Sequence, residues 1–148
     1  MRKFVVALLL LGACHAAGTP ASSPSPDGRQ TGAASPRAAV DAFLGAVKSQ
    51  DLQAMSVIWG RDKGPARDAI ERNELEKREL IMQCYLTHDS YRVLSDLTGE
   101  KGKRVFRVAL TKGQLTRETN FTTVRGPAER WYVEEVDLAA TADLCSRR

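Results

Sequence analysis

Few residues of this chain combine the types and spacing that a chemical site requires. His88 and Asp89 adjoin each other, and a histidine beside a carboxylate could supply a general base. The polar run 87–90 around them is more typical of a connection whose side chains bond backbone groups. Glu135 and Asp137 fall on one strand face and could bind a cation. Without further carboxylates nearby, a solvated strand face is the better interpretation.

The motifs that mark catalysis are absent from the sequence as well. No serine stands in a nucleophile-elbow context, and there is no glycine-rich phosphate loop and no zinc-protease helix motif. We therefore expect no cofactor and no metal site. Basic and acidic residues alternate closely, as in residues 72–79, and do not form a basic stretch. This pattern predicts a solvated surface and no nucleic-acid partner.

The start of the chain predicts export. Two cations precede an apolar run from Phe4 to Leu11, and small residues follow, which is typical of a secretory signal peptide. The run is well short of the ~20 apolar residues that a membrane-spanning helix needs. Leu11-Gly12-Ala13-Cys14 resembles a lipobox, the motif of bacterial lipoproteins. The resemblance implies cleavage before Cys14, a diacylglyceryl group on its thiol and an acylated amino terminus. An ordinary signal peptide with an incidental Cys14 is the alternative.

The predicted organisation is a signal peptide at 1–13, a lipidated Cys14 with a tether at 14–35, and one small domain at 36–148. The tether is rich in Ala, Ser, Pro and Gly, so it cannot bury enough apolar surface to become ordered. It should hold the domain clear of a membrane to which the lipid attaches it. His15 stands where an aspartate favours inner-membrane retention in proteobacterial lipoproteins. The outer membrane of the cell envelope is therefore the expected address, with the domain in the periplasm or at the cell surface.

Lipidation of Cys14 would leave Cys84 and Cys145 as the only two thiols, and they permit one intramolecular pairing. In an oxidising envelope compartment this pair can form a stable disulfide. The bond would join the end of a central helix to the end of the chain. The alternative is two separate buried thiols.

The hydrophobic pattern predicts helices first. Ser35-Pro36 is typical of a helix start, and the apolar residues that follow recur at helical spacing: Val40, Phe43, Leu44 and Val47. Asp51 should cap a second, short helix that ends near Trp59. A third, strongly charged helix is expected from Pro65, with a buried stripe of Ile70, Leu80, Ile81, Cys84 and Tyr85.

Strands follow the helices. Alternating patterns and turn residues predict four of them, at 91–94, 104–111, 114–125 and 130–138. Helices gathered before such strands favour an α+β domain, with the N-terminal helices packed on a curved antiparallel sheet of about four strands.

This order of elements resembles the nuclear transport factor 2-like (cystatin-like) superfamily. The resemblance rests on the helical segment 38–47, the helix start Asp51-Leu52 and the closing strand 131–136. It implies a cone-like fold with an apolar pocket between helices and sheet. The aromatic residues that could line the pocket are Trp59, Tyr85, Phe106, Phe121 and Trp131, although a domain of this size needs most of them for its core.

Enzymes of that superfamily use a pocket carboxylate or histidine as base, with tyrosines donating to an oxyanion. The resemblance therefore makes His88 and Asp41 the candidate bases, with Tyr85 and Tyr91 as donors. Because no complete catalytic arrangement is evident, we expect a non-catalytic envelope lipoprotein that binds a small apolar ligand, a peptide or an envelope protein. A small lyase- or isomerase-like enzyme and a self-associating scaffold, such as a homodimer, are the alternatives.

Overall fold

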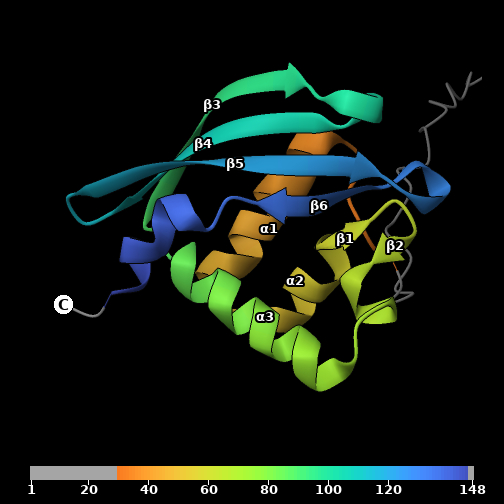
Figure 1. Ribbon diagram of the computed structural model, residues 1–148, viewed down its shortest axis with the longest axis horizontal. Coiled ribbons are helices and arrows are strands. Elements are labelled where there is room, and N and C mark those ends of the chain that lie inside the picture. The colour runs from red at the N-terminus through yellow and green to blue at the C-terminus, as the bar shows by residue number, and fades with distance from the viewer. Residues whose placement is uncertain (1–29, 147–148) are drawn as a thin grey trace, which may run out of the picture.

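The chain folds in the expected order, helices first and strands afterwards (Figure 1). The computed structural model describes residues 30–146, so the expected signal peptide, Cys14 and most of the expected tether lie outside the described residues. The α-helices are α1 (Pro36–Ser49), α2 (Leu52–Ile58) and α3 (Arg72–Tyr85). Short 3₁₀ helices are η1 (Ala66–Asp68), η2 (Glu100–Gly102), η3 (Pro127–Glu129) and η4 (Ala139–Cys145).

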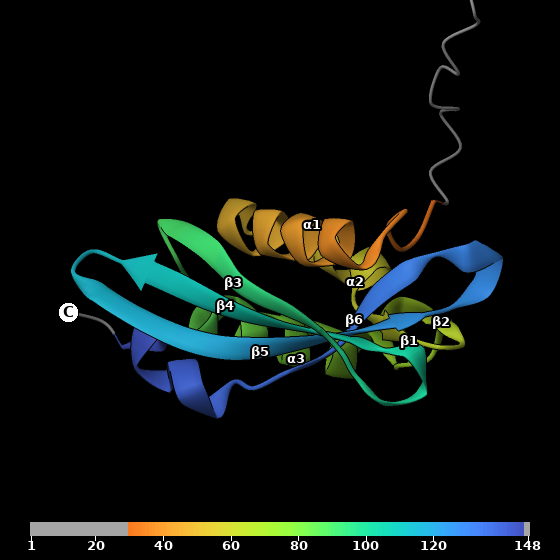
Figure 2. The same cartoon turned by 90° about the horizontal axis from the view of Figure 1, so that it is seen from above.

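The main sheet confirms the predicted α+β class with an antiparallel sheet of four strands. Its strands are β3 (Ser90–Thr98), β4 (Arg104–Lys112), β5 (Leu115–Arg125) and β6 (Trp131–Val136). They lie in sequence order, so each pairs with its neighbours in the chain. A separate two-stranded hairpin joins β1 (Gly60–Arg61) to β2 (Gly64–Pro65). Figure 2 shows that the main sheet is strongly twisted, with α1 lying along one side of it.

Helix α1 forms the layer that covers β5 and β6. The Ser35 hydroxyl accepts the N–H of Ala38 at 3.2 Å and so caps the first turn. All four residues expected on the inner face are buried: Val40, Phe43, Leu44 and Val47. The ring of Phe43 meets Phe121 edge-on, with 6.3 Å between centroids. Phe121 in turn lies opposite Phe106 across the β4–β5 ladder, so the three rings join helix to sheet.

The folded part begins before α1. Ala33 pairs with Trp131 through two backbone hydrogen bonds of 2.8 and 2.9 Å, which adds a short segment to the edge of β6. Gly32 has φ of +68°, and a Cβ there would lie 2.9 Å from the Tyr132 ring. Residues 31–33, expected to belong to the tether, are therefore part of the domain.

The third helix differs from the prediction in both its start and its buried face. Residues 60–68 form the hairpin and η1 instead, and α3 begins at Arg72, where the Glu71 carboxylate accepts two backbone N–H groups. Its buried residues are Leu75, Glu79 and Met82, whereas Leu80 and Ile81 are about half exposed, at 47% and 51%. The predicted stripe through Leu80 and Ile81 is therefore wrong. Helix α2 packs against one part of α3 and η4 against another. These contacts give α3 a rotation about its axis that differs from the one the sequence predicted.

The last turns of the chain return to α3. Helix η4 packs on α3 and β5, and Leu144 is fully buried. The Cα atoms of Cys84 and Cys145 lie 4.8 Å apart, and their sulfur atoms are at disulfide-bonding distance. The predicted pairing is thus geometrically satisfied, and it would join the end of α3 to the end of η4.

Replacing both Cys84 and Cys145 by serine should lower the free energy of unfolding by about 4 kcal/mol, because the bond closes a loop of 61 residues in sequence separation. Urea unfolding of the oxidised protein and the double variant measures the difference. Mass spectrometry of the unreduced digest should show the two cysteine peptides joined. Two thiols that alkylate fully without a reductant would contradict the pairing.

Candidate functional site

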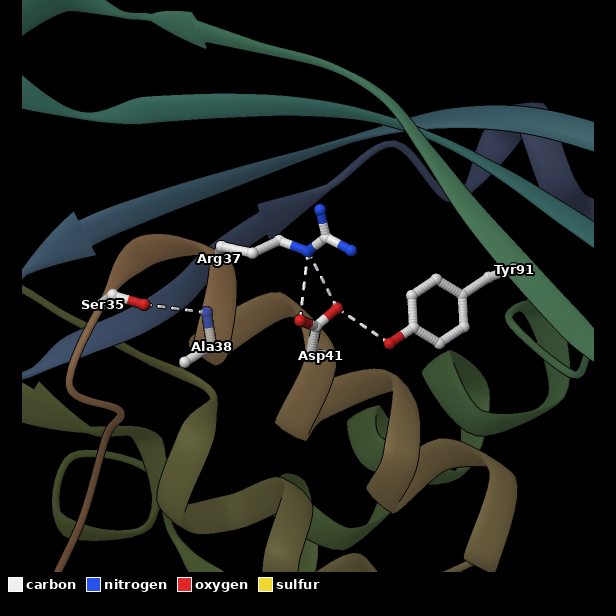
Figure 3. Close-up of polar contacts among 5 residues, drawn as sticks. All are labelled: Ser35, Arg37, Ala38, Asp41 and Tyr91. Carbon is white, nitrogen blue, oxygen red and sulfur yellow. Dashed lines mark hydrogen bonds and ion pairs between the residues drawn. The ribbon is translucent and has the colours of Figure 1, made fainter.

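Two of the sequence candidates, Asp41 and Tyr91, lie together where α1 meets β3 (Figure 3). Tyr91 donates its hydroxyl proton to Asp41 Oδ1 at 2.8 Å. The Arg37 Nε lies 3.0 and 3.1 Å from the two carboxylate oxygens of Asp41. Burial and the Asp41 carboxylate raise the pKa of Tyr91 to about 12. Because its proton is held tightly and already donated, Tyr91 is poorly suited to protonate a substrate, and the array serves to hold α1 against β3.

His88, the other candidate base, is buried next to this array. Its Nδ1 lies 2.8 Å from the carbonyl oxygen of Leu86, so Nδ1 carries the proton and donates it. Its ring stands edge-on to Tyr91 with 5.6 Å between centroids. Its Nε2 has no hydrogen-bond partner and His88 lines neither of the pockets described below. The histidine is therefore buried and outside the lining of both pockets.

The neighbouring Asp89 forms hydrogen bonds that hold local segments of the backbone in place. Its Oδ2 accepts the N–H of Gly113 at 2.7 Å, and its carbonyl oxygen accepts the Lys48 ammonium at 2.6 Å. Both contacts fit the interpretation of residues 87–90 as a polar connection. No hydrogen bond joins Asp89 to the His88 ring among residues 30–146.

The five aromatic residues expected around one apolar pocket lie in different places. Phe106 and Phe121 are buried in the core under α1. Trp59 and Trp131 are half-buried against the edge of that core, and Tyr85 is half-buried at the end of α3. Of the five, Trp59 alone lines one of the two pockets described here.

A pocket of about 490 Å³ with mixed polar and apolar walls lies between α2, η1 and α3. We call it the Glu79 pocket. Its walls combine apolar, polar and charged side chains: Leu52, Gln53, Ser56, Arg67, Asp68, Ile70, Arg72, Leu75, Glu76 and Glu79. Because α3 begins at Arg72, the chain before it, from η1 to Glu71, forms part of the pocket wall beside α2 and α3.

Glu79 is the unusual member of this lining. The residue is 3% exposed, and its Oε1 has no hydrogen-bond partner. The nearby Ser56 hydroxyl does not serve it, because that group donates to the Gln53 carbonyl oxygen at 2.7 Å. Burial, and secondly the negative charge of Glu76, raise the pKa of Glu79 from 4.5 to about 7. A carboxyl group in this state changes its charge near neutral pH and can accept either a proton or a cationic partner.

A second pocket, of about 550 Å³, lies on the other side of η1 beside the β1–β2 hairpin. Trp59, Arg78 and Glu134 contribute to its lining, and it shares Asp68 and Ile70 with the Glu79 pocket. Glu134 is already paired with the Lys103 ammonium at 2.5 Å. None of its lining residues has a buried, unpartnered side-chain atom, so the Glu79 pocket is the better candidate site.

Sequence reasoning missed Glu79 because it lies in the charged run interpreted as a solvated surface. A signal was present nonetheless. Leu75, Glu79, Met82 and Leu86 are four, three and four residues apart, which places them on one helical face. All four are buried. A glutamate within such a stripe is a buried carboxyl group.

No family model, curated protein or solved structure matches this chain. Among residues 30–146, no cluster of three histidine, cysteine or acidic side chains could hold a metal ion. Within the same residues, no helix has the length and hydrophobicity to cross a membrane.

The raised pKa of Glu79 predicts a specific dependence of stability on pH. The folded state binds this proton more tightly than the unfolded state, whose carboxyl has its ordinary value of 4.5. The free energy of unfolding should therefore fall as the pH rises from 4.5 to about 7, by about 3 kcal/mol in total, and then level off. Glu79→Gln cannot ionise, so this contribution disappears.

Urea unfolding of the protein and of Glu79→Gln at pH 4.5, 6 and 8 measures the effect as a difference between the two. The variant should gain relative stability as the pH rises. Glu74→Gln, on the same helix but exposed, is the matched control. Equal pH dependence in the protein and in Glu79→Gln would contradict the assigned burial.

Proposed function

We propose that this protein is a non-catalytic lipoprotein of the bacterial cell envelope, whose tethered domain binds a small ligand or a peptide side chain in the Glu79 pocket. The lipobox-like motif at 11–14 and the composition of residues 15–30 support the anchor and the tether. The α+β fold supports kinship with the nuclear transport factor 2-like superfamily, although a cone-like shape is part of the proposal. The outer membrane is the proposed address.

The observation that carries the binding role is the unpartnered carboxyl oxygen of Glu79 at a pocket wall. A buried polar group without a partner costs about 1–3 kcal/mol, and more when it is charged. A purely structural position is normally occupied by an apolar residue or by a polar group that has a partner. Glu79 has neither property, and a ligand that reaches the pocket would supply the missing partner.

A lyase- or isomerase-like enzyme is the second candidate, and one observation favours it. A carboxyl group with a pKa of about 7 is well suited to act as a general base at neutral pH. Neither Tyr85 nor Tyr91 lines the Glu79 pocket, so the donors that the superfamily resemblance implied do not stand beside this base. Arg67 and Arg72 are the cationic groups that could stabilise an anion there.

Self-association is supported by one edge of the sheet. Strand β3 is an edge strand and carries Leu94 and Leu97, which are 37% and 61% exposed. Exposed edges with apolar side chains readily pair with a second chain. A homodimer formed through β3 is compatible with ligand binding, because β3 contributes no residue to the Glu79 pocket.

Cys14→Ser should release the protein from membranes, because a protein without its acyl chains loses the apolar area that attaches it. Fractionation of cells that express either form, with metabolic labelling by a fatty-acid analogue, measures this. The unaltered protein should be labelled and sediment with membranes, and Cys14→Ser should be unlabelled. Labelling of the variant, or its unchanged sedimentation with membranes, would refute the lipid anchor at Cys14.

Gln53→Trp should abolish binding in the Glu79 pocket, because Gln53 is an exposed lining residue and a bulky ring there would take up pocket volume. A screen of fragments and short peptides by NMR should find ligands that shift signals of α2 and α3. Those ligands should be lost in Gln53→Trp and retained in Gln114→Trp, a control in the exposed β4–β5 turn. Ligands unaffected by Gln53→Trp, or turnover of any of them, would overturn a non-catalytic binding role at this pocket.

A further inference from the structure

We propose that the ligand of the Glu79 pocket is an organic cation, a protonated amine on an apolar body, whose ammonium group pairs with the Glu79 carboxylate. This inference rests on the proposed binding function and specifies the chemistry of its ligand. It depends on the depth of the carboxyl group, the apolar walls around it and the balance of charge in the pocket.

Because Glu79 is buried and its Oε1 has no hydrogen-bond partner, a ligand of this pocket has to supply a donor to it. Glu79 is only 3% exposed, and no hydrogen-bond donor reaches its Oε1. Leu52, Ile70 and Leu75 supply apolar surface in the same lining. An ammonium group can donate up to three hydrogen bonds, and its apolar body can cover these three side chains. A neutral apolar ligand would leave the carboxyl oxygen without a donor.

The charges facing the pocket favour a cation over an anion. Helix α3 contributes Arg72, Glu76 and Glu79, η1 contributes Arg67 and Asp68, and the lining residues of α2 carry no charge. Three carboxylates thus face two guanidinium groups, a formal balance of −1 when Glu79 is ionised. Arg67 Nε already lies 3.7 Å from Asp68 Oδ1. Glu76 repels the Glu79 charge, and a ligand cation would relieve this repulsion.

An inorganic metal ion fits the pocket less well than an amine. Asp68, Glu76 and Glu79 all belong to the lining, but in the described part of the chain no three acidic, histidine or cysteine side chains converge closely enough to hold a metal. A hard cation such as Ca²⁺ requires six to eight oxygen ligands. An ammonium group requires only a few acceptors and tolerates apolar surroundings for the rest of its molecule.

Proton competition gives the inference a quantitative signature. A proton and a ligand ammonium compete for the same carboxylate, so binding weakens as the pH falls below about 7, where Glu79 becomes protonated. Above that pH the affinity levels off until the amine itself loses its proton near pH 9 to 10. The dissociation constant should therefore increase about tenfold from pH 8 to pH 6. An uncharged ligand that prefers the protonated carboxyl would show the opposite trend.

The test compares benzylamine with its neutral isostere benzyl alcohol and with the anion benzoate, on the full chain in a non-ionic detergent. NMR titrations follow the amide signals of α2 and α3 at pH 6 and pH 8. Benzylamine should shift signals around the pocket, with about tenfold weaker binding at pH 6. Glu79→Gln should weaken its binding at least about tenfold and remove the pH dependence, because the charged partner is gone. The exposed Glu74→Gln should bind as the unaltered protein does.

The possible results separate the proposed ligand class from the proposed binding role of the pocket. If benzyl alcohol or benzoate shifts the pocket signals as strongly as benzylamine, the cation preference is refuted and the binding pocket stands. If none of the three probes shifts them, both the ligand class and the binding role of this pocket fail. Should Glu79→Gln not fold, the pH dependence of benzylamine binding to the unaltered protein decides alone, and a flat profile overturns the inference.

Discussion

The rotation of α3 about its axis is the constraint on which the arrangement of this domain depends. The helix contacts α2 and η1 on one part of its length and η4 on another. These contacts place Leu75, Glu79 and Met82 inward and leave Leu80 and Ile81 exposed. A rotation of roughly 100°, one residue step, would bury Leu80 and expose Glu79. The pocket, its buried carboxyl group and the meeting of Cys84 with Cys145 therefore all follow from one packing choice.

That packing choice carries an energetic cost at neutral pH. Ionised Glu79 lowers the free energy of unfolding by about 3 kcal/mol relative to a carboxyl group with its ordinary pKa. Domains of this size are stable by about 5–15 kcal/mol, so the cost is a substantial fraction of the total. A bond between Cys84 and Cys145, at the C-terminal end of the same helix, would contribute a stabilisation of similar size. Anchoring η4 to α3 thus helps the helix to keep the rotation that buries Glu79.

The elements that sequence could predict are those whose burial is decided locally. Helix α1 has one strongly apolar face, and the sheet covers that face, so spacing alone located Phe43 and its neighbours. The large apolar residues of β4 recur at every second position, and Phe106, Val108 and Leu110 are all buried. Helix α3 has two faces with apolar residues, one with Leu75 and Met82 and one with Leu80 and Ile81. Its packing against other elements determines which face is buried. Its start was also hidden, because Pro65 is compatible with a first helical turn but is used in the β1–β2 hairpin.

Asp41 and Glu79 show why residue type alone could not locate the site. Both are acidic residues within helices, and the superfamily resemblance pointed to Asp41. Asp41 accepts hydrogen bonds from Tyr91 and Arg37, so its acceptor capacity is used by the protein itself. Glu79 has no such donors on Oε1 and lies at a pocket wall. A carboxylate that the fold has satisfied stabilises structure, whereas a buried one left unsatisfied beside a cavity retains its capacity to bind a ligand.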